Sequence, residues 1–343
     1  MPQQTMKAVF LRGIRDVFER EVAVPEPGPR DVLVAVRAVG VCGSDVHYYE
    51  HGRIGDFAVK EPLVLGHECA GEVVEVGPEV QSLSVGDRVA LEPGIPCRHC
   101  AYCLSGRYNL CRDVVFMGTP PNPGAFREYV TSPEDFAYRL PESVSTEAGA
   151  TVEPLAVAVH ACSRAGVGAG ESVAVLGAGP IGLLVVAVAA AEGATDIAAV
   201  DLVDMRLDFA RRMGATRTIR ADQTDVAEEL ADTADVVLDC VGVEETLAEA
   251  FDVARPGGRV AWIGMAADMA PVPLIKAEAK ELSIVTVFRY ANVYRRAINL
   301  LAAGRVEAAS LVTHRFSFPE VGEALRFVAE NRASTIKTLV VFG

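Results

Sequence analysis

Four cysteines stand close together near residue 100, at positions 97, 100, 103 and 111. The loop that carries them is rich in proline, glycine and arginine and poor in apolar residues. Four thiolates at this spacing complete a tetrahedral shell around zinc, and a closed shell leaves no position for a substrate. Cys97, Cys100, Cys103 and Cys111 therefore predict a structural zinc site that stabilises this lobe. Two disulfides or a small iron–sulfur cluster are the alternatives.

A second group of potential metal ligands is spread along the chain. Cys42 follows one strand-like run, and His67 with Glu68 follows the run 62–65, so we expect these residues in loops beside strands. A thiolate, an imidazole and a carboxylate with one open position are the arrangement of a catalytic zinc site. Glu153 lies in an otherwise apolar run, where a carboxylate is unfavourable unless it is paired or binds a metal or the metal's water. We predict a catalytic zinc at these residues.

A glycine-rich turn follows another strand-like run and opens an apolar helix. Glycines in this context let backbone N–H groups approach a pyrophosphate. Asp201 ends the next predicted strand, where its carboxylate can bind both ribose hydroxyls and would repel a 2′-phosphate. The pattern therefore predicts an NAD site, with cofactor-binding residues Gly177, Gly179, Pro180, Ile181, Gly182 and Asp201.

This nucleotide site has alternatives. A similar turn occurs in α/β proteins of other function, in which Asp201 would only cap the following helix. Arg206 is a further cofactor-binding candidate, because it is placed to contact the adenine or to accept a phosphate, although a solvated helix arginine fits as well. The strictness of NAD over NADP therefore stays open. The remaining cysteines and two isolated histidines receive no role: Cys69, Cys162, Cys240, His160 and His314.

The segments that position these residues fall into two kinds. Before about residue 150, short runs at 6–11, 31–41, 70–76 and 88–91 predict a β-rich domain. From 151 to about 287, strand-like runs at 172–176, 196–200, 235–239 and 259–263 alternate with helical stretches, which predicts a doubly wound parallel sheet. After Pro319, apolar residues at helical spacing predict a helix, and residues 337–342 predict a closing strand.

Composition limits the classes of partner. The chain has 343 residues, 50% of them hydrophobic, which suits about two folded domains. Its net charge of -14 disfavours nucleic acids and anionic membrane surfaces, so a small-molecule substrate is expected. The first residues lack the long apolar run of a signal peptide, and glycines and a proline interrupt the most apolar stretch, 173–191. We expect a cytoplasmic protein.

The motifs resemble those of the zinc-containing medium-chain dehydrogenases, and within them the sorbitol (polyol) dehydrogenase branch. The family's zinc signature is matched by Gly66-His67-Glu68-x2-Gly71-x5-Gly77-x2-Val80. The polyol branch is matched by residues 43–55, Thr119-Pro120-Pro121, Glu153-Pro154-Leu155 and Val287-Phe288-Arg289-Tyr290. Classical alcohol dehydrogenases have cysteine where Glu153 stands, so the chain departs from them toward the polyol branch.

The resemblance runs essentially from end to end and implies a fold. A GroES-like catalytic domain would comprise residues 1–155 and 288–343, with a Rossmann NAD-binding domain, 156–287, inserted between its parts. The active site would lie in the cleft. The four lobe cysteines, which some animal sorbitol dehydrogenases have lost, imply a second zinc per chain.

The resemblance also assigns roles to residues. Cys42, His67 and Glu68 would hold the catalytic zinc, with Glu153 on the metal or one water away. The implied catalytic residues are Ser44 as first proton acceptor, His47 as relay terminus and Glu153 as the alternative acceptor. A turn hydroxyl that bonds the backbone is the alternative for Ser44, and a residue that only orders the loop is the alternative for His47. The implied substrate-binding residues are Tyr48, Phe116, Glu153, Arg289 and Tyr290, and the segment after the Rossmann domain would add Val287, Phe288 and Arg289 to the cofactor contacts.

The implied reaction transfers a hydride from a secondary hydroxyl of a polyol to NAD and yields a ketose. Other zinc dehydrogenases, acting on L-arabinitol, threonine or simple secondary alcohols, are the nearest alternatives. A zinc- and nucleotide-binding module without activity is the alternative of another class. The family suggests a homotetramer or dimer, and residues 272–274 and 284–287 are expected to form strands that pair across subunits.

Overall fold

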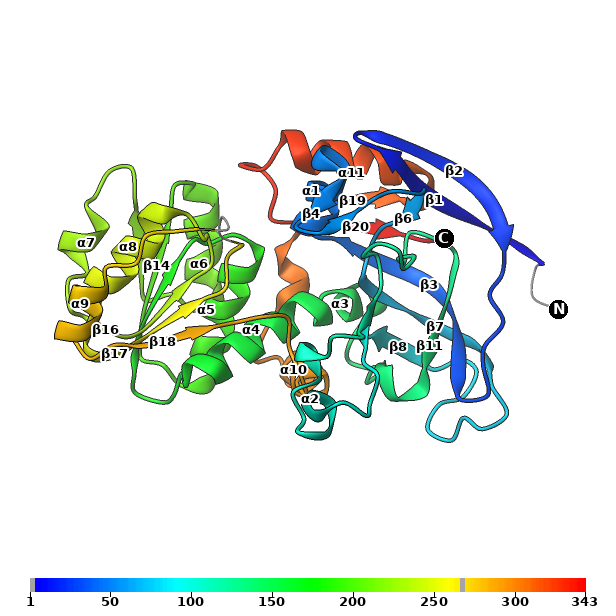
Figure 1. The fold of residues 1–343 in the computed structure, drawn as a ribbon, viewed down its shortest axis with the longest axis horizontal. Helices are drawn as coiled ribbons and strands as arrows, with labels where there is room; N and C mark the ends of the chain where they lie inside the picture. The colour runs from blue at the N-terminus through cyan, green and yellow to red at the C-terminus, as the bar shows by residue number, and fades with distance from the viewer. Residues whose placement is uncertain (1–3, 266–268) are drawn as a thin grey trace. The chain divides into compact units, whose positions relative to one another are not determined.

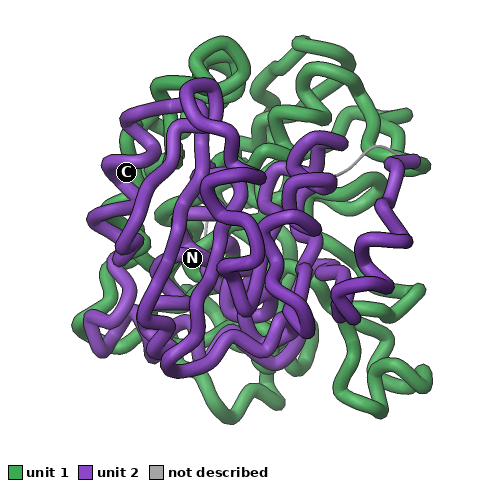
Figure 2. The backbone as a smooth tube through the Cα atoms, turned by 90° about the vertical axis from the view of Figure 1, so that its left-hand side faces the viewer, with its two compact units in different colours: residues 1–153, 308–343 green, residues 154–307 purple. Residues whose placement is uncertain are grey.

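The computed structural model describes residues 4–265 and 269–343. The chain forms two compact units, Met1–Glu153 with Ala308–Gly343, and Pro154–Glu307, which are coloured separately in Figure 2. The second unit thus continues past the expected return at residue 288. The helix α10 (Tyr294–Ala302) belongs to it because Arg296 donates to the Ser163 hydroxyl at 2.9 Å and to the Glu192 carboxylate at 2.7 Å.

A seven-stranded sheet forms the centre of the first unit, in the order β12-β8-β7-β3-β20-β19 with β11 paired to β3. The last strand of the chain, β20, lies beside β3 (Figure 1). The two strands are antiparallel, and Thr338 stands opposite Val41. On the other edge of β3, Gly40 stands opposite Glu68 of β7. The strands are β3 (Asp31–Val41), β7 (Glu68–Val76), β8 (Arg88–Leu91), β11 (Tyr129–Pro133), β12 (Ala137–Arg139), β19 (Val312–Ser317) and β20 (Lys337–Val341).

A smaller sheet of order β2-β1-β6 shares the core of this unit. Its strands are β1 (Thr5–Gly13), β2 (Asp16–Ala23) and β6 (Leu63–Val64). The predicted C-terminal helix is α11 (Val321–Glu330), which buries Val321, Ala324 and Leu325 in that core. Full burial of a valine or leucine side chain contributes about 1.5–3 kcal/mol. The remaining short elements are β4 (Arg53–Ile54), β5 (Phe57–Ala58), η2 (Glu134–Phe136), α3 (Thr146–Ala150), η3 (Ala308–Leu311) and η4 (Phe318–Glu320).

The segment after Cys42 is a helix, α1 (Gly43–His51), and not the loop that the sequence suggested. The Asp45 carboxylate accepts a hydrogen bond from the Cys42 backbone N–H at 3.0 Å, which satisfies one donor at the helix start. Gly52 ends the helix with a φ of 68°, a left-handed conformation that favours glycine. The residues expected to handle protons and substrate, Ser44, His47 and Tyr48, therefore project from a helix of fixed geometry.

The four-cysteine lobe consists of short elements: β9 (Gly94–Ile95), α2 (Ala101–Leu104), η1 (Tyr108–Leu110) and β10 (Val115–Phe116). Within α2 and η1, no side chain is buried. An apolar core therefore cannot hold these two elements, which agrees with the low apolar content of the loop.

The second unit contains a six-stranded parallel sheet of order β15-β14-β13-β16-β17-β18 (Figure 1). Its strands are β13 (Ser172–Leu176), β14 (Asp196–Asp201), β15 (Arg217–Arg220), β16 (Ala234–Asp239), β17 (Ala254–Trp262) and β18 (Ser283–Thr286). Its helices, besides α10, are α4 (Val152–Ala165), which begins in the first unit, α5 (Pro180–Glu192), α6 (Asp204–Met213), α7 (Val226–Glu229), α8 (Glu244–Val253) and α9 (Leu274–Ala279). The alternation of strands and helices confirms the predicted doubly wound class.

One strand prediction in this unit is wrong. Residues 272–273 are not part of a strand, and Leu274 begins α9, because Pro273 lacks a backbone N–H and stands at the helix start. Among residues 4–265 and 269–343, none of the helices combines the length and the apolar character needed to cross a bilayer.

Candidate functional site

Three side chains of the first unit form a compact group of potential metal ligands. The sulfur of Cys42, a ring nitrogen of His67 and a carboxylate oxygen of Glu68 all lie within 4.8 Å of one another. Cys42 stands between β3 and α1, His67 directly precedes β7, and Glu68 begins that strand. The pairing of β3 with β7 brings the three together.

The chemistry of this group fits zinc. Sulfur, imidazole nitrogen and carboxylate oxygen are the donors that zinc prefers. The Oε2 atom of Glu68 is buried and accepts no hydrogen bond. A buried carboxylate oxygen in that state is unfavourable, and a bound cation would satisfy it.

Asp45 connects the two segments that carry these ligands. Its carboxylate accepts hydrogen bonds from the backbone N–H groups of Cys42 and Gly66, each at 3.0 Å, and its Oδ1 lies 3.6 Å from Nδ1 of His67. Burial alone would raise the pKa of Asp45, but His67 and the two N–H groups bring the pKa below its ordinary value. Asp45 therefore stays ionised and orients the His67 ring, as carboxylates do behind metal-binding histidines.

Glu153 lies close to this group but outside it. The side chain is 6% exposed, at the start of α4, and its charge acts on Lys337 and on Glu92. In the described part of the chain, the ligand atoms within 4.8 Å of one another do not include a Glu153 oxygen. Its binding to the metal or to the metal's water stays a prediction.

The expected proton-handling and substrate residues of this unit lie on two elements. Ser44 is half-buried in the first turn of α1, and Tyr48 is buried one turn further on. The His47 ring stacks on His51 with centroids 4.4 Å apart, and burial, followed by the His51 charge, lowers the pKa of His47. Phe116, from β10, places its ring 5.6 Å from the His67 ring, so it can serve as an apolar wall beside the metal group.

The four lobe cysteines form a second compact group. Their sulfurs lie within 4.8 Å of one another, with Cys100 and Cys103 3.4 Å apart. The eight cysteines, all of which the structure describes, are free thiols, which argues against the two-disulfide alternative. The backbone N–H of His99 lowers the pKa of Cys97 to about 6, so a thiolate forms there readily. Four convergent sulfurs fit zinc, with every coordination position filled by protein.

A buried carboxylate that the sequence reasoning missed ties this lobe to the large sheet. Glu92 is 2% exposed and accepts hydrogen bonds from the Tyr108 hydroxyl of the lobe at 2.7 Å and from the Tyr138 hydroxyl of β12 at 2.9 Å. Burial raises the pKa of Glu92 to about 7. The signal in the sequence was an acidic residue directly after the apolar strand 88–91.

The predicted nucleotide residues come together in the second unit. Gly177 has a φ of 87°, and a Cβ on Gly182 would lie 1.8 Å from the Gly177 carbonyl oxygen, so both positions require glycine. Pro180 begins α5 behind this turn. Asp201 accepts a hydrogen bond from the Ala178 N–H at 2.8 Å, and Arg206 lies 3.5 Å from the same carboxylate oxygen.

A second buried acid shapes this turn. Asp239, at the end of β16, is fully buried and accepts hydrogen bonds from the N–H groups of Val241 and Gly242 at 3.0 and 3.2 Å. Burial raises its pKa. The Val241 side chain packs directly against Gly177, since a Cβ on Gly177 would lie 2.4 Å from Cγ2 of Val241. Asp239 therefore positions one wall of the glycine turn, a role that no sequence motif indicated.

The segment 287–290 lies in the second unit, after β18. Arg289 has a φ of 53°, which is uncommon for a residue other than glycine, and its guanidinium lies 4.7 Å from the ring centroid of Phe288. Phe288 is exposed, while Tyr290 is buried and its ring lies 5.6 Å from that of Tyr294. The assignment of Arg289 and Tyr290 to substrate, and of Val287, Phe288 and Arg289 to the cofactor, stays a prediction.

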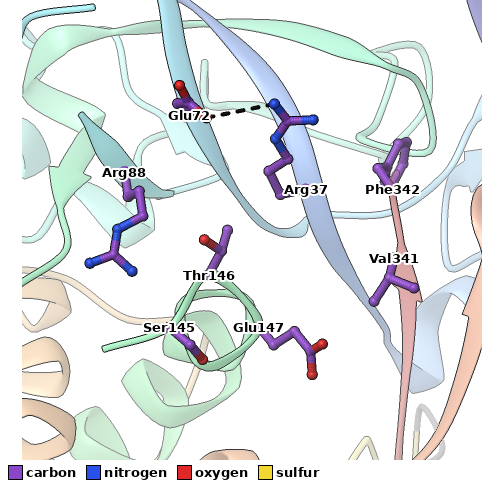
Figure 3. Close-up of a pocket in the computed structure, with 8 residues that line it drawn as sticks. All are labelled: Arg37, Glu72, Arg88, Ser145, Thr146, Glu147, Val341 and Phe342. Atoms are coloured by element: carbon purple, nitrogen blue, oxygen red, sulfur yellow. Dashed lines mark ion pairs between the residues drawn. The ribbon is translucent and has the colours of Figure 1, made fainter. Parts of the chain in front are cut away.

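A surface pocket of about 560 Å³ in the first unit lies elsewhere and contains none of the predicted site residues (Figure 3). Its charged groups have partners within the protein. Arg37 pairs with Glu72 at 3.6 Å, Glu147 pairs with Arg315 at 2.9 Å, and Arg88 donates to the Val144 carbonyl oxygen at 2.8 Å. The pocket therefore presents no free charge that would select a ligand.

Two family models match the chain, one for each type of unit. Residues 28–142 match the alcohol dehydrogenase GroES-like domain, and residues 180–303 match the zinc-binding dehydrogenase domain. The chain belongs to the zinc-binding alcohol dehydrogenases. The GroES-like and doubly wound fold expected from the resemblance is thereby confirmed.

Curated relatives of this zinc-binding dehydrogenase cover almost its whole length. It is 46% identical over 341 residues to the probable D-xylulose reductase A of Aspergillus clavatus, covering 96% of this chain and 95% of that protein. It is 42% identical over 356 residues to sorbitol dehydrogenase 1 of Saccharomyces cerevisiae, covering 100% of this chain and 99% of that protein.

Solved structures of similar proteins have the same fold. An oxidoreductase of unknown specificity from Escherichia coli is 37% identical with a TM-score of 0.95, covering 99% of both chains. A zinc-binding dehydrogenase from Sinorhizobium meliloti, with NADP bound, is 35% identical with a TM-score of 0.91, covering 99% of this chain and 100% of that one.

Proposed function

We propose that this dehydrogenase oxidises a secondary hydroxyl of a small polyol to a ketone, with zinc and NAD. The observation that carries the proposal is the Cys42–His67–Glu68 group, whose sulfur, nitrogen and oxygen donors converge in a chain similar to relatives named for D-xylulose and sorbitol. When bound, zinc would lower the pKa of a substrate hydroxyl, and NAD would accept the hydride from the carbon that carries this hydroxyl.

The residues around the metal group have separate tasks in this proposal. Asp45 holds the His67 ring and the Cys42 backbone in place. Ser44 accepts the hydroxyl proton on its Oγ and passes its own proton to a ring nitrogen of His47, which is half-buried and therefore reaches water. Glu153 is the alternative acceptor. The four lobe cysteines bind a second zinc that stabilises the fold and takes no part in the reaction.

Substrate class is the first test of this function. A polyol offers adjacent hydroxyls, and a site whose buried polar groups bind them rejects analogues that leave those groups unpaired. We expect kcat/KM for sorbitol or xylitol to exceed that for 2-butanol and ethanol by at least about a hundredfold. The measurement is NADH formation over a panel of polyols, alcohols and threonine, with the ketose product identified by chromatography.

The panel also separates the alternatives. Threonine or a simple secondary alcohol as the best substrate would assign the chain to another branch of the family. A preparation that contains zinc and binds NADH but oxidises none of the compounds would be a binding module, and the enzymatic proposal would be wrong.

Cofactor choice gives a second prediction, based on Asp201 at the end of β14. Its charge repels a 2′-phosphate and its oxygens bind ribose hydroxyls, each effect being worth on the order of 1 kcal/mol or more. We therefore expect NAD to be preferred over NADP by at least about tenfold in kcat/KM. Asp201→Ser should narrow this ratio. Steady-state kinetics with both cofactors measures it.

A matched variant separates charge from loop structure. Asp201→Asn keeps an oxygen that can accept the Ala178 N–H but removes the charge, so it should narrow the ratio while preserving NAD binding better than Asp201→Ser. Equal use of both cofactors by the unmutated enzyme would instead indicate that Arg206 and its neighbours decide the preference.

We further propose a cytoplasmic homo-oligomer, a dimer or a tetramer. The strand β18 stands at the edge of the second unit's sheet and exposes 38% of Ile284. The neighbouring helix α9 exposes 69% of Leu274 and 85% of Ile275. Among residues 4–265 and 269–343, β18 pairs with β17 alone, and an edge strand with exposed apolar side chains is suited to pairing with a second copy.

A further inference from the structure

Lys337 is a buried cation at the metal group, although no motif marked it. Its side chain is almost fully buried, and Nζ donates to Oε1 of Glu68 at 2.6 Å and to the Val41 carbonyl oxygen at 3.1 Å. Val41 directly precedes Cys42 in the chain. One ammonium group therefore contacts both segments that supply ligands.

The sheet register explains this placement. In β20, Thr338 pairs with Val41 of β3, and in β7 Glu68 pairs with Gly40 of β3. Lys337 and Glu68 therefore reach the same end of β3 from its two neighbouring strands. They are separated by 269 residues in the sequence.

The two oxygens of Glu68 are in different states. Oε1 is bound by Lys337, whereas Oε2 is buried without a hydrogen-bond partner. A Cβ on Gly40 would lie 1.8 Å from Oε2, so the carboxylate is confined between the ammonium group and the backbone of β3. Because Oε1 already has a strong partner, Oε2 is the oxygen that remains for a cation.

The formal charges of the site give Lys337 a second effect. Zinc binds cysteine as a thiolate, so with Asp45, Glu68 and Glu153 as carboxylates the site counts four negative charges, three of them on buried side chains. A zinc ion supplies two positive charges. The charges of Cys42 and Glu153 act directly on the ammonium group, so Lys337 offsets part of the excess.

We propose that Lys337 is a positioning residue that keeps Glu68 a one-oxygen zinc ligand. By holding Oε1, it prevents the carboxylate from binding the metal with both oxygens, so that a zinc held by Cys42, His67 and Glu68 would be four-coordinate with the substrate oxygen bound. The proposal rests on the catalytic zinc of the proposed function, but it does not require that the substrate be a polyol.

The test compares Lys337→Met, which removes charge and donor, with Lys337→Gln, which keeps a donor, in the Co²⁺-reconstituted enzyme. Four-coordinate Co²⁺ absorbs visible light more strongly than five-coordinate Co²⁺. At full metal content, we expect Lys337→Met to lose much of the visible absorption of four-coordinate Co²⁺, because Glu68 would then bind with both oxygens. Lys337→Gln should lose an intermediate amount. Oxidation of the best substrate should fall at least about tenfold in Lys337→Met, since a metal that binds a second Glu68 oxygen beside the substrate oxygen would be five-coordinate and would polarise the substrate less.

Glu68→Gln completes a double-variant cycle. Without a carboxylate there is no second anionic oxygen to bind, so Lys337→Met added to Glu68→Gln should not change the spectrum further. Circular dichroism and thermal unfolding identify which variants fold. If Lys337→Met does not fold, Lys337→Gln replaces it in the test, and its Co²⁺ absorption should be lower than that of the unmutated enzyme.

The outcomes are separable. An unchanged Co²⁺ spectrum in a folded Lys337 variant overturns the proposal, and so does an equal spectral change in the presence and absence of the Glu68 carboxylate. A spectral change in Lys337→Met, in an enzyme that proves inactive toward every polyol, leaves the positioning role intact and removes only the polyol assignment.

Discussion

Replacing His67 with alanine is expected to abolish turnover while most of the protein stays folded. His67 supplies the nitrogen donor of the Cys42–His67–Glu68 group and is held by Asp45. A metal that polarises the reacting oxygen stabilises the transition state by several kcal/mol, so kcat should fall by at least about a thousandfold. Metal analysis should find one zinc per chain lost, with a modest change in thermal unfolding.

Cys100→Ser is the matched variant at the other cluster, and the opposite pattern is expected. A closed four-sulfur shell contributes folding free energy and no open position, so its loss should lower the melting temperature by on the order of 5 °C or more. Folded molecules should still turn over, because Glu92 and Tyr108 also hold the lobe to the sheet. Activity is therefore compared per folded molecule.

The two variants together test the division of labour between the clusters. If Cys100→Ser abolished kcat in molecules that remain folded, the lobe would have a catalytic role. If a fully active preparation of the unmutated enzyme contained one metal per chain, the prediction of two zinc ions would be wrong.

The parallel sheet could be predicted because its strands carry their signal locally. Strands buried on both faces read as continuous apolar runs, and β13 and β16 lie in such runs between turn residues. The strand β3 was predicted with its observed bounds, Asp31–Val41, from the alternating faces of its residues. The glycine turn was found because its backbone conformation admits few residue types.

Elements with weak local signals were missed. The strand β2 (Asp16–Ala23) is charged and largely exposed, and its pairing with β1 fixes it as a strand. The helix α1 lacks a clear apolar stripe, and Tyr48, Tyr49 and Val46 are buried because of what the rest of the fold places around them. Its usable signals were the Asp45 cap and Gly52 at the end.

The site was predictable as a set of residue types but not as an arrangement. Cys42, His67 and the four lobe cysteines have few other uses at such spacing, so the sequence indicated them directly. Lys337 and Glu92 have ordinary neighbours in the sequence, and their roles depend on strand register and on burial. Register between distant strands is set by the complete sheet, which local patterns do not contain.

Arg289→Ala is expected to separate polyols from simple alcohols. If the guanidinium binds substrate hydroxyls, its loss should lower kcat/KM for sorbitol or xylitol by about 10–100-fold, since a hydrogen bond from a charged donor contributes about 1.5–3 kcal/mol. The value for 2-butanol should change by less than about threefold, because that substrate has no second hydroxyl to be held. Kinetics at saturating NAD measure both.

Two further variants define what such a result means. Arg295→Ala removes an exposed arginine from helix α10, which follows in the chain, and should leave kcat/KM unchanged for both substrates. Arg289→Lys keeps the charge without the planar fork and should recover only part of the polyol activity. If Arg289→Ala lowers kcat/KM equally for both substrates, the residue serves the cofactor or the strained backbone at its φ of 53°. If 2-butanol is the better substrate from the outset, the polyol assignment itself is wrong.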